Sequence, residues 1–203
     1  VLIDHRIRKN STKEANAVKS LLKKNNIHLD ILTNKKKIIN NVQGNARKIR
    51  YEMISKYSKK RKSNTILTAH NLEDQVETFF IRLSRGSGLH GLSSMKKNSK
   101  LDKRLNLFRP LLDVKKKELR KISVLVFGKY LKDSSNRDTK FLRIKIRNLK
   151  KHLENSGIKY EQITRSINNL ASSKEVLDGY YDVVSKKIIK KVKNKIFINL
   201  NKF

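Results

Sequence analysis

The order of strand-type and helix-type segments in the first 83 residues constrains the fold most strongly. The alternating segments are Val1–Asp4, Ser11–Asn25, Ile27–Leu32, Val42–Tyr57, Thr65–Ala69 and a helix that begins at Leu72. Apolar runs of strand type are thus followed three times by segments of helical periodicity. This alternation implies right-handed crossovers between parallel strands. We therefore predict an α/β fold, a Rossmann-like parallel sheet with helices on both faces.

The remainder of the chain has a different pattern. From Lys115 to about Lys191 it is helical, with interruptions at Asp133–Asp138 and Ser156–Gly157, and Ile196–Leu200 fits one more strand that has nothing after it to pair with. We place a domain boundary near residue 114. Residues 1–114 form the predicted α/β domain, and residues 115–203 form a smaller, mainly helical and basic region. A capping box from Ser11 to Glu14 is expected to open the first helix.

The charge balance narrows the class of partner. The chain holds 50 Lys and Arg against 17 Asp and Glu, a net charge of +33, which favours nucleic acid. Coding bias towards lysine is the alternative explanation. The sequence contains no cysteine, so these residues provide no disulfide, Cys-ligated zinc, iron–sulfur cluster or thiol nucleophile. No apolar run is long enough to span a membrane, and we expect a cytoplasmic location without membrane partners.

A histidine and two carboxylates form the strongest local signal. His70 stands at the carboxyl end of a predicted parallel strand, where open α/β sheets place ligands. Asp74 and Glu77 are three residues apart on the next helix and share a face. Such a group could hold Mg²⁺, bind an ammonium group or accept a proton from an amine. Alternatively, the acids only complement the helix dipole and His70 ends the strand. No metal-ligand set is assigned.

Three further clusters are cationic or glycine-rich. Arg47 and Arg50 lie three apart on a helix, which suits phosphate oxygens, and Arg143 and Arg147 lie on one side of a later helix. The third cluster is Arg85, Gly86, Ser87 and Gly88, where glycines let backbone approach a ligand closely. Each cluster alone also fits a solvated surface.

Taken in order, these clusters match a known family. The stretches NVQGNARKIRY, LTAHNLEDQVETFFIRLSRGSGLHGLSSM, FRPLL and DSSNRDTKFLRIKIR lie in one chain. With them, the sequence resembles the bacterial tRNA(Ile)-lysidine synthetases, members of the PP-loop ATP-pyrophosphatase superfamily. The resemblance implies that residues 1–114 are a nucleotide-binding PP-loop-type domain and that residues 115–203 contact tRNA.

The resemblance also implies an activity. In this family ATP, with Mg²⁺, adenylates the wobble cytidine of a tRNA(Ile) with a CAU anticodon, and free L-lysine then displaces AMP to form lysidine. By motif, Asp74 and Glu77 would contact lysine, and His70 and Arg50 would act in the adenylation. The implied nucleotide- or tRNA-binding residues are Arg47, Arg85, Gly86, Ser87, Gly88, Arg143 and Arg147. The sequence leaves open whether the protein works as a monomer or a homodimer.

The sequence also departs from the family pattern. The family's Ser-Gly-Gly-x-Asp-Ser phosphate loop has no counterpart, and we expect it before Val1, in a longer protein of which this chain is a fragment. Ser134 stands where the family usually has proline, and Ile144 where asparagine follows the arginine. Two other functions stay open. One is a cysteine-free relative of the tRNA thiolases, and the other is a non-catalytic basic RNA-binding protein.

Overall fold

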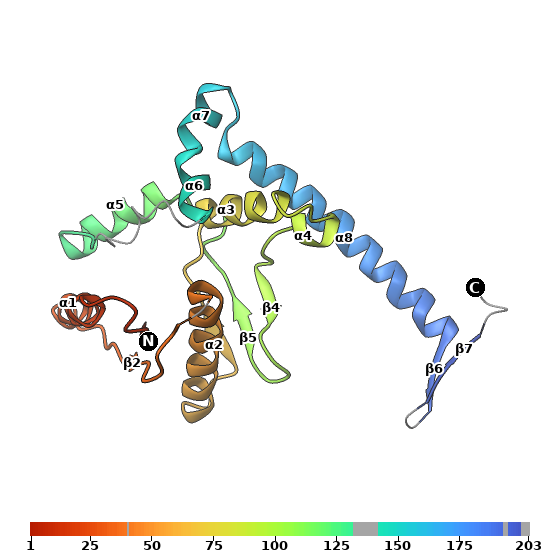
Figure 1. The fold of residues 1–203 in the computed structure, drawn as a ribbon, viewed down its shortest axis with the longest axis horizontal. Helices are drawn as coiled ribbons and strands as arrows, with labels where there is room; N and C mark the ends of the chain where they lie inside the picture. The colour runs from red at the N-terminus through yellow and green to blue at the C-terminus, as the bar shows by residue number, and fades with distance from the viewer. Residues whose placement is uncertain (40, 132–141, 193–194, 200–203) are drawn as a thin grey trace. The chain divides into compact units, whose positions relative to one another are not determined.

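The computed structural model describes residues 1–39, 41–131, 142–192 and 195–199, and it divides the chain into two compact units (Figure 1). One unit comprises Val1–Ala69 with Lys97–Ser135, and the other comprises His70–Lys96 with Asn136–Phe203. Each unit is therefore built from two separate stretches of chain. The domain boundary expected near residue 114 stays a prediction.

The first unit contains the parallel strand pairs. Strand β1 (Leu2–Asp4) pairs in parallel with β2 (Ile31–Thr33), and helix α1 (Ser11–Lys23) connects them. Strand β3 (Thr65–Leu67) pairs in parallel with β5 (Asn106–Phe108). The α/β class with parallel pairing is thus confirmed, although the described strands of this unit form two small sheets in place of one continuous sheet.

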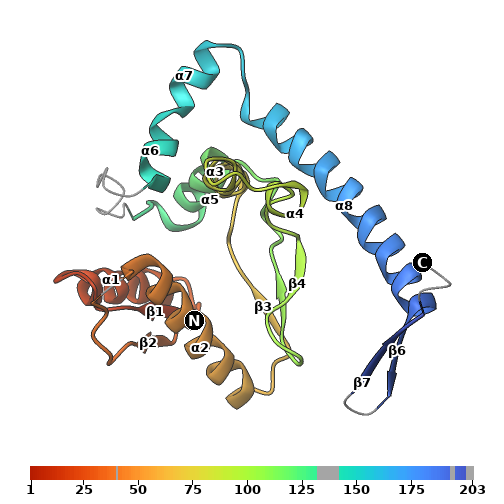
Figure 2. The same ribbon diagram turned by 45° about the vertical axis from the view of Figure 1, so that its right-hand side comes forward.

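The other elements of this unit extend the second sheet and cover it. Strand β4 (Asn98–Lys100) lies antiparallel on the other side of β5, so β3 is an edge strand in the described part of the chain. The remaining helices are α2 (Val42–Lys60) and α5 (Lys116–Phe127). The ribbon in Figure 2 shows α1 beside β1 and β2.

One apolar cluster joins the two small sheets. Ile54 of α2 is buried together with Ile66 of β3 and Leu107 of β5. Ile3 of β1 and Tyr51 of α2 pack against the same cluster. Burial of these side chains gives the first unit a common core.

The second unit is helical. Its elements are α3 (Leu72–Leu83), α4 (Leu89–Leu92), α6 (Leu142–Asn148), α7 (Lys150–Asn155), α8 (Tyr160–Ile188) and the hairpin of β6 (Ile189–Val192) with β7 (Lys195–Ile198). Helix α3 lies at its centre and contacts α4, α6 and α8. Val76 of α3 is fully buried against Tyr160, Ile163 and Ile167 at the start of α8.

The structure corrects several local expectations. The capping box at Ser11 is wrong, because the amide of Glu14 donates to the carbonyl of Asn10 and the Glu14 carboxylate pairs with Arg8 at 3.0 Å. The final strand does have a partner, since β7 pairs with β6, which was expected to be helical. The interruption expected at Asp133–Asp138 lies outside the described residues. Within those residues, no helix combines the length and the apolarity needed to cross a membrane.

Candidate active site

A true capping box stands at the start of α3. The Asn71 side-chain oxygen accepts from the Asp74 amide at 3.0 Å, and Asp74 Oδ2 accepts from the Asn71 amide at 3.1 Å. Asp74 is half-buried, and its Oδ1 has no hydrogen-bond partner among the described residues. The box therefore fixes the Asp74 carboxylate while leaving one oxygen available to a ligand. His70, also half-buried, directly precedes this box.

Glu77, one turn further along α3, is held by two arginines of α6. Its side chain is 2 % exposed. Arg147 donates through Nε to Oε1 at 2.7 Å and through Nη2 to Oε2 at 3.1 Å. Arg143 Nε lies 3.2 Å from Oε2. We call Glu77, Arg143 and Arg147 the Glu77 cluster; both carboxylate oxygens in it are already engaged.

The electrostatics follow from this geometry. The hydrogen bonds to Glu77 raise the pKa of Arg147 above its usual value, more strongly than burial lowers it, and the charge of Asp74 acts in the same direction. Lys150 of α7 approaches Glu73 at 3.6 Å. The acidic face of α3 is thus the surface on which the basic α6–α7 segment docks. Ile144 and Ile146 of α6 are buried in addition.

Two side chains of α3 fix the loop that carries the glycines. Gln75 donates to the Met95 carbonyl at 2.8 Å and accepts from the Met95 amide at 3.0 Å. Arg82 Nη1 donates to the carbonyls of Gly91 at 2.7 Å and Ser94 at 3.0 Å. Neither Gln75 nor Arg82 was predicted from the sequence as a site residue. The only indication in the sequence was that both residues lie within the stretch LTAHNLEDQVETFFIRLSRGSGLHGLSSM.

The loop itself shows why its glycines are needed. Gly86 has φ +68°, a left-handed conformation that other residues adopt at a cost. A Cβ on Gly91 would lie 2.5 Å from the Cβ of Ser87, so only glycine fits there. Arg85, Gly86 and Gly88 are exposed, and Ser87 is half-buried. The loop is therefore a fixed turn with an accessible backbone.

The arginines of α2 belong to the first unit. Arg50 Nε donates to His5 Nε2 at 3.4 Å, just after β1. Burial lowers the pKa of His5, and the Arg50 charge lowers it further, against the opposing charge of Asp4. The Arg47 guanidinium lies 5.1 Å from the centre of the Tyr51 ring. Both arginines are exposed along α2.

Two buried groups of this unit were not singled out from the sequence. Arg109 follows β5, is 6 % exposed and donates to the Ser99 hydroxyl at 3.0 Å; burial lowers its pKa. Asp4 at the end of β1 is 2 % exposed and accepts from the Thr12 hydroxyl at 2.6 Å and the Arg6 amide at 3.0 Å. Both belong to strand ends of the parallel pairs, the position at which such sheets bind ligands.

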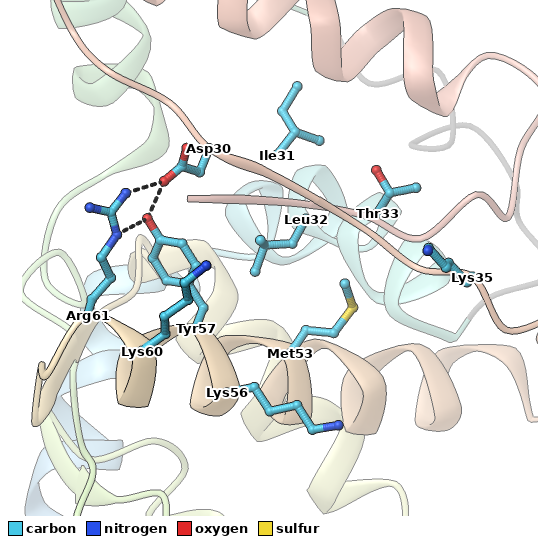
Figure 3. Close-up of a pocket in the computed structure, with 10 residues that line it drawn as sticks. All are labelled: Asp30, Ile31, Leu32, Thr33, Lys35, Met53, Lys56, Tyr57, Lys60 and Arg61. Atoms are coloured by element: carbon cyan, nitrogen blue, oxygen red, sulfur yellow. Dashed lines mark hydrogen bonds and ion pairs between the residues drawn. The ribbon is translucent and has the colours of Figure 1, made fainter.

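A cavity of about 980 Å³ opens elsewhere in the first unit, between β2 and α2 (Figure 3). Leu32 and Met53 line its apolar part. At one end Tyr57 and Arg61 donate to Asp30, which lowers the pKa of that carboxyl far below its usual range, the Tyr57 hydrogen bond contributing most. None of the residues predicted for catalysis or binding lines this cavity.

The described residues contain no preformed metal-binding centre. No group of three or more His, Asp or Glu side chains in them comes together in a way that could hold an ion. The residues around Asp74 provide a single accessible carboxylate. They do not by themselves fit Mg²⁺, which needs several oxygen ligands.

The family follows from comparison with known proteins. The family model of the PP-loop domain matches residues 1–153, about three quarters of the chain. The chain belongs to the PP-loop domain family. Parallel β1–β2 and β3–β5 pairs and the ligand-type residues at their carboxyl ends agree with this membership.

Curated relatives of this PP-loop chain share one description. A tRNA(Ile)-lysidine synthase from Wolbachia pipientis wMel is 37 % identical over 180 residues, covering 88 % of this chain and 42 % of the relative. Proteins of the same description from Orientia tsutsugamushi and Rhodopseudomonas palustris are 37 % and 35 % identical, covering 74 % and 81 % of this chain. These matches cover 34 % of the Orientia protein and 48 % of the Rhodopseudomonas protein. The PP-loop chain therefore spans less than half of these relatives.

A solved structure shows the same fold. The U34-tRNA thiolase NcsA from Methanococcus maripaludis, with its [4Fe-4S] cluster, superposes with a TM-score of 0.65 at 17 % sequence identity. The match covers 84 % of this PP-loop chain and 60 % of the thiolase. At this identity the likeness concerns the fold alone.

In this PP-loop chain the residues predicted for binding and catalysis fall into two groups. The second unit brings Glu77, Arg143 and Arg147 into direct contact, with Asp74 one turn away on α3. The same unit contains His70 and the Arg85–Gly88 turn. The first unit contains Arg47 and Arg50, which contact Tyr51 and His5 respectively.

Proposed function

We propose that this chain is part of an ATP-dependent ligase that joins free L-lysine to C2 of the wobble cytidine of a tRNA(Ile) with a CAU anticodon. The observation that carries the proposal is the sequence likeness to proteins described as tRNA(Ile)-lysidine synthase, at 33–39 % identity. ATP is a substrate of this reaction, and Mg²⁺ would accompany it. The chain spans only part of these relatives, so the activity concerns the complete protein.

The site chemistry supports this proposal. Adenylation and transfer of an amine both develop charge that fixed cations and carboxylates can stabilise. Asp74 has one carboxylate oxygen that the capping box does not use, and a carboxylate oxygen suits the ammonium of lysine. By the resemblance, His70 and Arg50 are the proposed adenylation residues, and Arg47 is a proposed nucleotide- or tRNA-binding residue. The Arg85–Gly88 turn would approach the nucleotide through its backbone.

The charge of the chain supports a nucleic-acid substrate. A net charge of +33 favours association with the phosphate backbone of tRNA. Residues 96–151 alone hold 20 Lys and Arg against 5 acidic residues. A tRNA thiolase is the alternative enzyme of this fold, but the related thiolase holds an iron–sulfur cluster and these 203 residues contain no cysteine to bind one.

The decisive experiment uses protein expressed from the complete reading frame. It should release AMP from ATP only when both a CAU-anticodon tRNA(Ile) transcript and L-lysine are present. Asp74→Ala should raise the KM for lysine about tenfold or more, because a hydrogen bond to a charged group contributes about 1.5–3 kcal/mol. An unchanged KM would reject Asp74 as the lysine contact. AMP release that ignores lysine would reject the ligase.

A further inference from the structure

The turn that follows β1 is fixed by its neighbours. Asn34, directly after β2, is 5 % exposed, and its Nδ2 donates to the carbonyls of Lys36 at 2.6 Å and His5 at 3.4 Å. The Asn34 amide donates to the Asp4 carbonyl at 2.8 Å. Arg6 has φ +51°, a left-handed conformation that a residue with a side chain keeps only where its surroundings enforce it. The backbone on both sides of His5 is therefore held in place.

The His5 side chain leads from this turn to α2. Its Nε2 accepts from Arg50 Nε at 3.4 Å, although the two residues are 45 positions apart. Its Nδ1 is buried and has no hydrogen-bond partner among the described residues. A ring nitrogen that accepts a hydrogen bond carries no proton, so a neutral His5 in this contact has its proton on Nδ1. The contact with Arg50 thus requires one tautomer of the neutral imidazole.

A protonated His5 cannot make this contact. An imidazolium carries a proton on both ring nitrogens, so it has no atom that accepts from Arg50. The charged groups that act on His5 are Arg50, which together with burial lowers its pKa, and Asp4, which raises it. Both Asp4 oxygens already accept, from the Arg6 amide at 3.0 Å and the Thr12 hydroxyl at 2.6 Å. Acidification should therefore replace an accepted hydrogen bond by repulsion between two cations.

The contact also limits the freedom of Arg50. An arginine on an exposed helix surface has many rotamers, and a partner for its Nε selects among them. The rotamer that His5 selects directs Nε towards the carboxyl end of β1, the end at which open α/β sheets bind ligands.

We propose that His5 is a positioning residue for Arg50, and that protonation of its imidazole releases the guanidinium and slows adenylation. The inference rests on the proposed function, in which Arg50 acts in the adenylation. It adds a residue to that site and gives the reaction an acid limit. Asn34 acts one step further away, because it fixes the backbone that carries the imidazole.

The first test measures the contact without any activity. Protein from the complete reading frame is labelled with ¹⁵N-histidine, and two-bond ¹H–¹⁵N spectra give the tautomer and the pKa of each imidazole. The variant His5→Gln assigns the His5 signals by their loss. His5 should carry its proton on Nδ1 and should titrate below pH 6.5. Arg50→Gln should raise the pKa of His5 and allow the other tautomer.

Arg47→Gln is the matched control for this measurement. Arg47 lies one turn earlier on the exposed side of α2 and contacts the Tyr51 ring. Its loss removes the same charge but leaves the hydrogen bond to His5, so the His5 tautomer should stay unchanged. The inference is overturned if His5 carries its proton on Nε2, or if both arginine variants change its pKa equally.

The second test is the pH dependence of AMP release by the same protein with the tRNA transcript and L-lysine. The wild-type rate should fall as the pH drops through the measured pKa of His5. His5→Gln should keep its rate at low pH, because the glutamine carbonyl accepts from Arg50 and does not titrate. His28→Gln, which changes an exposed histidine, should leave the wild-type profile. His5→Ala should lower kcat about fivefold at alkaline pH and leave the KM for lysine within about twofold.

The outcomes separate this inference from the proposed function. An acid limb that persists in His5→Gln would overturn the inference, because another group would then set it. A wild-type kcat in His5→Ala would do the same. If the wild type releases no AMP at any pH, the proposed function fails, and the NMR comparison still decides whether His5 holds Arg50.

Discussion

Two carboxylates on one helix, Asp74 and Glu77, illustrate what a sequence pattern can and cannot predict. Asp74 and Glu77 were both found from their spacing, but the spacing gave them the same role. The difference arises from Arg147, which is 70 residues away and is not visible in a local pattern. Breaking a buried pair such as Glu77–Arg147 costs about 3–5 kcal/mol, whereas an exposed pair such as Arg8–Glu14 contributes about 0–1 kcal/mol.

Asp4 provides a prediction about stability and pH. Burial by itself would raise its pKa, but hydrogen bonds from the Thr12 hydroxyl and the Arg6 amide outweigh burial and lower the pKa below 3.8. A lowered pKa in the folded state means stability that is present above the unfolded value and is lost as pH falls through the folded value. Thr12→Val should therefore lower the free energy of unfolding by about 1–3 kcal/mol at pH 7.

The stability lost through Thr12→Val should become smaller as the pH falls below about 3.8, because the Thr12 hydroxyl stabilises a protonated Asp4 carboxyl less than a charged one. Urea unfolding of both proteins between pH 7 and pH 3 measures it. Thr65→Val is the matched control, since its hydroxyl is exposed, and should stay within about 0.5 kcal/mol. A Thr12→Val difference that does not vary with pH would argue against the link to Asp4.

At the scale of elements, periodicity predicted the helices well and the strands only in part. The starts of α2 and α3 at Val42 and Leu72 agree with the sequence, because their apolar residues repeat with helical spacing. Strand β4 was missed, since Asn98–Lys100 is polar and forms by pairing with β5. Strand β6 was missed because Ile189–Val192 continues a helical pattern until β7 pairs with it.

The loop after α3 allows a test within one element. Gly91→Ala places a methyl group 2.5 Å from the Ser87 Cβ, so the turn has to shift, at a cost of about 1–3 kcal/mol. Gly88→Ala meets no atom within 4 Å and has a negative φ, so it is the matched control. Thermal unfolding compares the two variants. Ser87→Gly should rescue Gly91→Ala, and equal destabilisation by both alanines would contradict the packing argument.

At the scale of the whole molecule, the charge could be read from composition, whereas the division into two interleaved units could not. The amino-acid composition alone gives the net charge of +33. The units are different, because His70–Lys96 joins residues 136–203 through contacts of α3 with α6 and α8. Such long-range contacts depend on packing between segments that are far apart in sequence, and only structure reveals them.

The charge leads to a prediction for RNA binding. The affinity for a tRNA(Ile) transcript should fall linearly with salt on logarithmic axes, by about tenfold or more between 50 and 200 mM, because bound phosphates release counterions. Fluorescence anisotropy at several salt concentrations measures this slope. A flat response would show that the lysines reflect coding bias and do not form an RNA-binding surface.

The separation between Glu77 and its partners also has a consequence on the ribosome. Translation proceeds at about 5–20 residues per second, so Arg147 is made roughly 4–14 s after Glu77. During that interval α3 lacks the later residues that bury Val76 and that pair with Glu77. Completion of the helical unit must wait for residues 142–167, and a chaperone that shields α3 would act in this window.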